Sequence, residues 1–384
     1  METKRICYVS ALLLACCTAG KAQDQGEEIR QYKGYELVWH DEFDVDGAPD
    51  PANWTFERGF VRNQEDQWYQ EDNAFCEGGR LIIEGRKERF PNPEYGRYND
   101  WRNREYVDYT SACVTTDRLH SWTYGRFVIR AKIPAFTGCW PAIWTLGQQY
   151  NGLYSWPHNG EIDIMEFYQI GGKPYILANA CWGSTTSKYS PTWNTKTKPY
   201  SMFLAQDPEW GEKFHEWRMD WDENYIKLYL DDELLNVIPL ASTVNPQTTF
   251  FNVEGYNPFR KPQYLLLNLA LGGINGGSLS NTPFPCRYEI DYVRVYQKSA
   301  SAVQSVADTV GADAVGAEGR ILLSCPEGTS PEVCVADLSG REVWRGSVEA
   351  HGGPCVLPFR PAPGVYVVRT VVGGESVSSK VMVW

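Results

Sequence analysis

Three carboxylates lie close together in one short stretch of the chain. The stretch is residues 160–167, which read Gly-Glu-Ile-Asp-Ile-Met-Glu-Phe. Successive side chains of a strand point to opposite faces, so Glu161 and Asp163 share a face. Glu166 follows Glu161 at an odd offset, which puts it on the other face unless one β-bulge near Ile164 and Met165 restores it. We therefore predict a bulged strand that presents all three acids along one cleft floor.

Paired carboxylates are the usual equipment for glycoside hydrolysis. With one bulge, the Cα atoms of Glu161 and Glu166 lie about 13 Å apart, because a strand rises about 3.3 Å per residue. Two glutamates that lean toward each other bring their carboxyl groups to about 5 Å, the separation of a retaining mechanism. The charge of Asp163 between them helps to keep one glutamate protonated. A solvated acidic strand face and a metal site are the alternatives for these acids considered alone.

Tryptophans flank the acidic stretch on its N-terminal side. Trp140 and Trp144 precede it in the segment Trp-Pro-Ala-Ile-Trp, and Trp156 stands just before it. Aromatic rings offer flat apolar faces on which sugars stack, and large exposed aromatic groups mark binding surfaces. The acids and the rings together favour a carbohydrate-cleaving cleft in which these three tryptophans line the subsites.

Four segments resemble glycoside hydrolase family 16, which includes laminarinases, lichenases, agarases and endo-β-galactosidases. They are residues 124–127, 130–134, 140–144 and 160–166. The resemblance runs from about residue 35 to about residue 297. It implies an all-β jelly-roll sandwich with a concave substrate cleft. It also implies the roles of the acids, with Glu161 as nucleophile, Glu166 as acid/base and Asp163 as helper.

The resemblance also bears on the substrate. Asn63 lies in a polar-aromatic loop where laminarinases place an Asn that contacts the sugar beside the cut. Many β-glucan-cleaving relatives carry a His on the strand after the acids, where this chain has Cys181 or Trp182, so Trp182 is a further expected substrate contact. Asn179 on that strand looks closer to endo-β-galactosidases. We expect an endo-β-1,4-galactosidase acting on poly-N-acetyllactosamine of mucin-type O-glycans or keratan; the alternatives are an endo-β-1,3(4)-glucanase and a non-catalytic glycan-binding jelly roll.

A structural calcium is often found in the family. The matching ligands here are Glu42, the backbone of Gly79, and Asp291, and oxygen ligands suit calcium. The alternative is a capped turn and an exposed strand acid. No cofactor is expected for catalysis itself.

The composition narrows the choice of partners. The net charge is −12, which disfavours nucleic acid and anionic membrane surfaces. Aromatic residues make up 14% of the chain, which is consistent with carbohydrate contact. We expect a monomer whose partner is a β-linked oligosaccharide or polysaccharide.

The N-terminal segment has the pattern of an export signal. Residues 1–22 place Lys4 and Arg5 before a short apolar run, as a signal peptide does. Either a signal-peptidase site follows Ala22, or Cys16 is the lipidated residue of a lipobox that provides an outer-membrane anchor. We expect a secreted or cell-surface protein, in the outer membrane or periplasm of a Gram-negative bacterium.

The sequence also suggests how the mature chain is divided. We expect a catalytic jelly roll over residues 30–298, a linker of small residues over 299–319, and a small β-sandwich over 320–384. The last segment resembles the C-terminal sorting domain of type IX secretion, which makes the secretion machinery a further partner. Eight cysteines follow residue 22, and we expect most of them to be small buried hydrophobic residues.

Overall fold

The structure is a computed structural model of the chain. It describes residues 29–149, 155–184, 190–246, 257–299, 313–317, 319–325, 328–338, 340–349, 355–372 and 375–383. The expected signal peptide, with Cys16, and most of the expected linker lie outside the described residues. Within the described part of the chain, no helix has the length and apolar character needed to cross a membrane.

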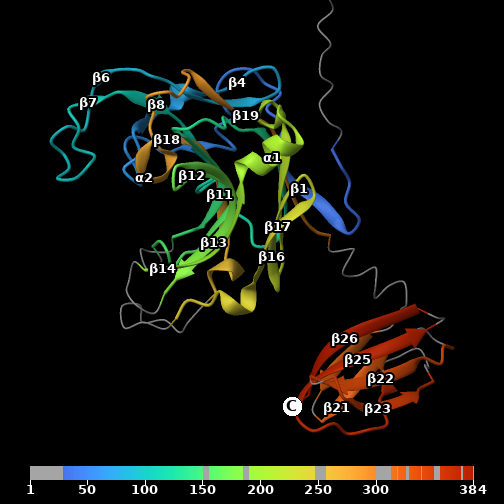
Figure 1. Cartoon of the computed structure of the whole chain (residues 1–384). Coiled ribbons are helices and arrows are strands. Elements are labelled where there is room, and N and C mark those ends of the chain that lie inside the picture. Colours follow the sequence, from blue (N-terminus) through green and yellow to red (C-terminus); the bar gives the residue numbers. More distant parts are fainter. Residues whose placement is uncertain are drawn as a thin grey trace, which may run out of the picture. The chain divides into compact units, whose positions relative to one another are not determined.

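Seven described strands form the sheet that carries the acids, called the cleft sheet here. In spatial order they are β14 (Pro191–Pro199), β13 (Lys173–Gly183), β12 (Glu161–Ile170), β11 (Cys139–Gly147), β18 (Gln263–Leu271), β9 (Cys113–Thr115) and β2 (Thr55–Phe56). Every neighbouring pair is antiparallel. Figure 1 shows β11 to β14 side by side. The motif strand β12 is therefore central, between β11 with its tryptophans and β13.

Eight described strands form the second sheet, called the outer sheet here. The order is β17 (Glu233–Pro239), β16 (Tyr225–Leu230), β15 (His215–Trp221), β10 (Gly125–Lys132), β19 (Cys286–Lys298), β5 (Leu81–Gly85) and β4 (Ala74–Cys76). The remaining strand, β1 (Tyr35–Asp41), pairs with the second half of β19. Strands far apart in sequence are thus neighbours in both sheets, as a jelly roll requires.

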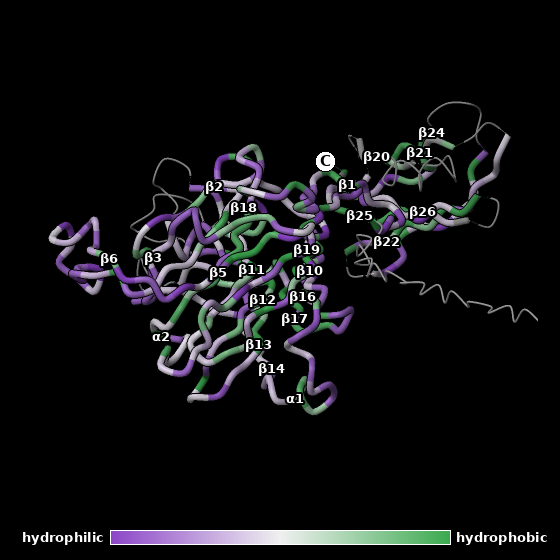
Figure 2. Tube along the Cα trace, turned by 90° about the horizontal axis from the view of Figure 1, so that it is seen from above, coloured by the Kyte–Doolittle hydropathy of each residue, from purple (hydrophilic) through white to green (hydrophobic). Residues whose placement is uncertain are grey.

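The two sheets enclose one large hydrophobic core. Ile162 and Phe167 of β12 meet Phe127 of β10 and Val293 of β19 there, and all four are fully buried. In Figure 2 the central strands carry long hydrophobic stretches, whereas the segment around β6 is hydrophilic. The prediction of an all-β jelly-roll sandwich is confirmed.

Shorter elements surround the cleft sheet. They are β3 (Gln67–Tyr69), which pairs in parallel with β8 (Tyr109–Ser111), the β6 (Phe90–Pro91) and β7 (Tyr106–Val107) ladder, and the helices α1 (Tyr200–Gln206) and α2 (Gly273–Gly276). The loop between β6 and β7 extends away from the sheets in Figure 1. Arg104 ties this loop to the segment before β3, because its Nη1 lies 2.8 Å from Oδ1 of Asp66.

Described residues from 313 onward form two small antiparallel sheets with a hydrophobic cluster of their own. The first contains β20 (Asp313–Ala317), β21 (Arg320–Ser324) and β24 (Cys355–Val356). The second contains β23 (Glu342–Ser347), β22 (Glu332–Asp337), β25 (Gly364–Val372) and β26 (Glu375–Val383). Ile321, Val335 and Val368 are fully buried between them. The expected small β-sandwich therefore has its own core, but it begins at Asp313 and not at residue 320, because residues 313–317, expected as linker, form a strand that pairs with β21.

Candidate active site

The motif strand β12 contains the bulge that the sequence predicts. Its register with β13 shifts between Asp163 and Glu166, and its register with β11 shifts at the same place. Ile164 and Met165 are both fully buried in the core. Two consecutive core-facing residues return Glu166 to the face that Glu161 and Asp163 occupy. The three acids therefore share one face of β12.

The three acids line a cleft of about 780 Å³ on the cleft sheet. Its lining is made of acids, amides and aromatic rings. The residues are Arg62, Asn63, Glu65, Trp140, Ala142, Trp144, Leu146, Trp156, Glu161, Asp163, Glu166, Tyr168, Asn179, Trp193, Thr195, Asn268, Ala270, Ile274 and Asn275. This is the size and lining of a small-ligand site.

Neutral N–H donors hold the two glutamates. Trp156 donates from Nε1 to Oε2 of Glu161 at 2.8 Å. Trp140 donates from Nε1 to Oε1 of Glu166 at 3.0 Å, and Asn179 donates from Nδ2 to its Oε2 at 2.8 Å. Both oxygens of Glu166 are therefore partnered by uncharged groups, which orient the carboxyl without neutralising its charge.

Burial raises the pKa values of all three acids. It raises the pKa of Glu161 to about 7, against the opposing effects of the Trp156 hydrogen bond and the Arg62 charge. Burial, together with the charge of Glu161, raises the pKa of Glu166 to about 7. Burial and the charges of both glutamates raise the pKa of Asp163 well above its ordinary value. Near neutral pH the three acids hold protons among them, which is what acid catalysis requires.

Asp163 has a pKa well above its ordinary value. It hydrogen-bonds to Glu161, and this bond raises the pKa of Asp163 while it lowers that of Glu161. The direction is that of a protonated Asp163 that donates to an ionised Glu161. Glu161 is thus the acid best prepared to carry negative charge.

Four residues expected to bind substrate line the cleft. They are Trp140, Trp144, Trp156 and Asn63. Asn63 has a positive φ of 55°, which Asn tolerates better than most residues. Contact with a sugar stays a prediction for all four.

The prediction that Trp182 contacts substrate is wrong. The Trp182 ring is 8% exposed and belongs to the core between the sheets, at 6.5 Å from the ring of Phe259. Asn179 faces the cleft, so Cys181 shares that face and Trp182 points the other way. Cys181 is the residue opposite Glu161 across the β12–β13 pair.

A buried polar network supports the cleft wall and was not expected from the sequence. Trp144 donates from Nε1 to Oδ1 of Asn268 at 2.7 Å, and Asn268 donates to the Tyr69 hydroxyl at 3.0 Å. That hydroxyl donates to Glu65 at 3.4 Å, and Asn63 donates to the other oxygen of Glu65 at 3.2 Å. Glu65 is 2% exposed, and burial raises its pKa. The chain of contacts fixes the rings and amides that face the cleft.

Trp193 and Arg62 also line the cleft. Trp193 on β14 is 43% exposed, pairs with Cys181 and lines the cleft. Arg62 lies over the Trp144 ring, with its guanidinium carbon 5.0 Å from the ring centroid, and pairs with Glu57. The signal for Trp193 was its place as a lone large apolar residue in a polar strand.

The residues expected to bind calcium do not assemble a metal site here. Both oxygens of Glu42 accept hydrogen bonds from Arg294, at 2.9 and 2.8 Å, and Asp291 accepts one from Arg130 at 2.6 Å. Across the described residues, no group of three or more His, Cys, Asp or Glu side chains is arranged to hold a metal ion. Because the two carboxylates are engaged by different arginines, the set does not fit calcium as it stands. Calcium binding stays a prediction, and no step below uses it.

Together, the sandwich fold, the ring-lined cleft and the proton-holding acids define an enzyme that acts on carbohydrate. Known proteins agree with this class. The family model described as "Glycosyl hydrolases family 16" matches residues 64–294. The chain belongs to this family and is an endo-acting glycoside hydrolase.

Three relatives show the range of substrates around this chain. A "Beta-glucanase" from Rhodothermus marinus is 35% identical over 310 residues, which are 77% of this chain and 94% of that protein. A "Keratan-sulfate endo-1,4-beta-galactosidase" from Sphingobacterium multivorum is 30% identical over 274 residues, 68% of this chain and 55% of that protein. A solved structure, reported with the finding that prominent members of the human gut microbiota express endo-acting O-glycanases, is 33% identical with a TM-score of 0.61. The match covers 71% of this chain and 94% of the chain in that structure.

Proposed function

We propose that the chain is a retaining endo-β-1,4-galactosidase that cleaves poly-N-acetyllactosamine in mucin-type O-glycans or keratan. The observation that carries the substrate class is the face that β13 and β14 present beside Glu161. Asn179, Cys181 and the exposed Trp193 occupy that face, where a β-glucan-cleaving relative is expected to carry a His. The keratan-sulfate endo-galactosidase and the O-glycanase structure among the similar proteins support this choice.

The first chemical step uses the two glutamates on opposite sides of the scissile bond. Glu161, ionised and held by Trp156, attacks the anomeric carbon. Glu166 carries a proton near neutral pH, because burial and the charge of Glu161 raise its pKa. It gives this proton to the leaving oxygen as the glycosidic bond breaks. The products are a glycosyl ester on Glu161 and a released fragment from the reducing-end side of the cut.

The second step reverses the role of Glu166. Once Glu161 is esterified it carries no charge, so one cause of the raised pKa of Glu166 disappears. The ionised Glu166 then takes a proton from water, which attacks the anomeric carbon and frees Glu161. Asn179 and Trp140 hold Glu166 in place through both steps. The anomeric configuration is retained overall.

A second candidate function is supported by the Rhodothermus marinus relative. That "Beta-glucanase" is similar to 77% of this chain, which favours an endo-β-1,3(4)-glucanase. In that case another polar residue, such as Asn179, replaces the missing His. A non-catalytic glycan-binding jelly roll is the third candidate. It is disfavoured because Glu161, Asp163 and Glu166 are all present and their pKa values are raised.

Product analysis separates these functions. The purified chain is incubated in parallel with keratan, mucin O-glycans, laminarin and mixed-linkage glucan, and the new reducing ends are identified by mass spectrometry. Galactose-ended fragments from keratan or mucin are expected, and proton NMR of the first product should show a β-anomer. Glucose-ended fragments from either glucan would establish the second function, and binding without cleavage of any substrate would establish the third.

The same assay tests the assignment of the nucleophile. Glu161→Gln should lower the cleavage rate by at least about a thousandfold, because the amide cannot form the glycosyl ester. Binding of the oligosaccharide should remain near normal. Glu36→Gln is the matched control, because Glu36 is exposed on β1. Substantial activity in Glu161→Gln would show that another residue attacks.

We also propose that the protein is exported, with residues 1–22 as the leader and the C-terminal β-sandwich as a secretion signal. The separate core of that sandwich supports this, since a sorting module must fold without the catalytic part.

A further inference from the structure

Two cysteines from different sheets lie in contact inside the core. Cys139 is the first residue of β11 in the cleft sheet, and Cys286 is the first residue of β19 in the outer sheet. Their Sγ atoms lie 3.6 Å apart, although the two residues are 147 positions apart in sequence. Cys139 is 0% exposed and Cys286 is 2% exposed. The segment between them includes most of the cleft sheet.

The strand next to Cys286 leaves space for its sulfur. Gly85 of β5 is paired with Cys286, and a Cβ on Gly85 would lie only 2.7 Å from the Cys286 Sγ. Any other residue at position 85 would therefore displace the sulfur. The Cys286 thiol contacts the Gly85 carbonyl oxygen at 3.8 Å. The absence of a side chain at Gly85 therefore leaves room for the Cys286 sulfur at its position beside Cys139.

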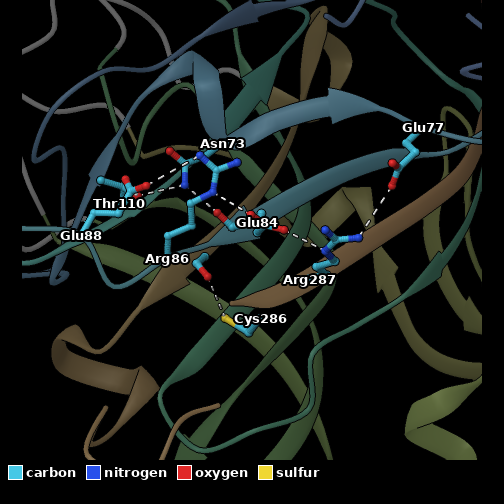
Figure 3. Close-up of polar contacts among 9 residues, drawn as sticks. Asn73, Glu77, Glu84, Arg86, Glu88, Thr110, Cys286 and Arg287 are labelled. Carbon is cyan, nitrogen blue, oxygen red and sulfur yellow. Dashed lines mark hydrogen bonds and ion pairs between the residues drawn. The ribbon is translucent and has the colours of Figure 1, made fainter. Parts of the chain in front are cut away.

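Charged pairs next to Cys286 fix the register between β5 and β19 (Figure 3). Arg287, next to Cys286, donates from Nε to Oε2 of Glu84 at 2.7 Å, and Arg86 donates from Nε to Oε1 of the same residue at 2.6 Å. Asn73 donates to the backbone carbonyl of Glu84 at 2.7 Å. These contacts surround Gly85 on both sides along β5. Cys286 is consequently held at one position relative to β5.

We propose that Cys139 and Cys286 form a disulfide that joins the cleft sheet to the outer sheet. The sulfurs must approach by about 1.5 Å to reach the bonded distance of about 2.05 Å. The oxidant is a small-molecule or protein disulfide. One cysteine thiolate attacks it, forms a mixed disulfide and releases one thiol. The second cysteine then attacks the first sulfur and releases the other thiol, so two cysteine thiols become one disulfide and the oxidant becomes two thiols.

Thiol–disulfide exchange at this pair is slow in the folded chain. In the folded chain, the hydrogen bond to Cys286 and burial raise the pKa of Cys139 far above that of an ordinary thiol. The thiolate that exchange requires is therefore scarce once the sheets have packed. The same burial protects the finished disulfide from reductants.

The test uses the whole chain and does not depend on the identity of its substrate. The protein is unfolded under reducing conditions and refolded in oxidised plus reduced glutathione. It is then denatured, alkylated without reductant and digested. We expect a peptide pair joined through Cys139 and Cys286 in the mass spectrum. Free, alkylated Cys139 and Cys286 would overturn the proposal, as would pairing of either with another cysteine.

Thermal unfolding gives an independent readout. The oxidised chain should unfold about 5–15 °C above the reduced chain, because the bond closes a long loop. Cys139→Ala/Cys286→Ala should abolish this difference, whereas Cys76→Ala, which removes another buried thiol, should keep it. A difference that survives in the double variant would place the responsible bond elsewhere. The peptide map decides the question if the double variant does not fold.

Discussion

At the scale of single residues, the site is organised by burial of like charges. Glu161, Asp163 and Glu166 lie on one strand face, and burial raises the pKa of each. Ionising them costs more free energy in the folded chain than in the unfolded chain. The contribution of the two glutamates to stability is therefore complete below about pH 4.5 and is lost as the pH rises through about 7, where they ionise in the folded state. Burial of these acids thus provides proton donors for catalysis and lowers the free energy of unfolding of the chain at neutral pH.

A titration of Glu166 tests this coupling. In the wild-type chain its midpoint should lie near pH 7, and in Glu161→Gln it should fall by about 1 pH unit, because a repelling charge has been removed. Carbon-13 NMR of labelled glutamate side chains measures both midpoints. Glu36→Gln should leave the Glu166 midpoint where it is. An unchanged midpoint in Glu161→Gln would mean that the two carboxyl groups do not interact.

At the scale of elements, the bulge in β12 decides which way Glu166 points. Inserting one Ala between Met165 and Glu166 shifts the alternation of every later residue in the strand, which turns Glu166 into the core and brings Phe167 out on the cleft side. We expect loss of cleavage and a fall in Tm of at least about 10 °C, measured by kinetics and by thermal unfolding followed by circular dichroism.

A volume-conserving change at the same bulge is the control. Met165→Leu keeps the register and should cost less than about 1.5 kcal/mol in the free energy of unfolding. It should also retain most of the cleavage rate. An insertion variant that remained fully active would show that the register after the bulge does not set the direction of Glu166.

Local alternation explains how far the sequence predicts this site. The odd offset between Glu161 and Glu166 was enough to predict the bulge, since acids on the core side would be too costly. The position of Trp182 was not fixed, because the sequence left open which of two neighbouring residues faced the cleft. Had Asn179 been taken as the cleft-facing residue, parity would have assigned Cys181 to that face.

Long-range contacts explain what the sequence could not predict. Glu65 and Asn268 are far apart in the chain and meet only through Tyr69, which donates to one and accepts from the other. Nothing in the local pattern of either segment indicates this meeting. The fold class was predictable because strand-like runs and turn residues recur along the chain. The buried network depends on which strands become neighbours.

At the scale of the whole molecule, the two largest hydrophobic clusters in the described part of the chain share no residue. One lies between the cleft and outer sheets, and the other lies within residues 313–383. A chain truncated after Lys298 should therefore cleave a soluble oligosaccharide with a kcat/KM within about twofold of the full chain. In a host with type IX secretion, it should remain inside the cell while the full chain reaches the medium.

Immunoblots of the cell and medium fractions, with kinetics on the purified proteins, measure both effects. Loss of activity on truncation would show that the C-terminal sandwich supports the catalytic part. Secretion of the truncated chain would show that residues 299–384 are not the signal. Glu36→Gln in the full chain is the control for both measurements.

Strand β14 is one of the two edge strands of the cleft sheet, and its only hydrogen-bonded neighbour among the described strands is β13. Proline occupies both ends of this strand, at 191 and 199, and Lys196 and Lys198 lie between them. Proline offers no N–H to an incoming strand, and the exposed Lys196 must give up hydration before another sheet can dock. The strand beside the cleft is thus protected against edge-to-edge aggregation. A chain rich in β-strands can therefore avoid aggregation at high concentration while the cleft face of this sheet stays open to the substrate.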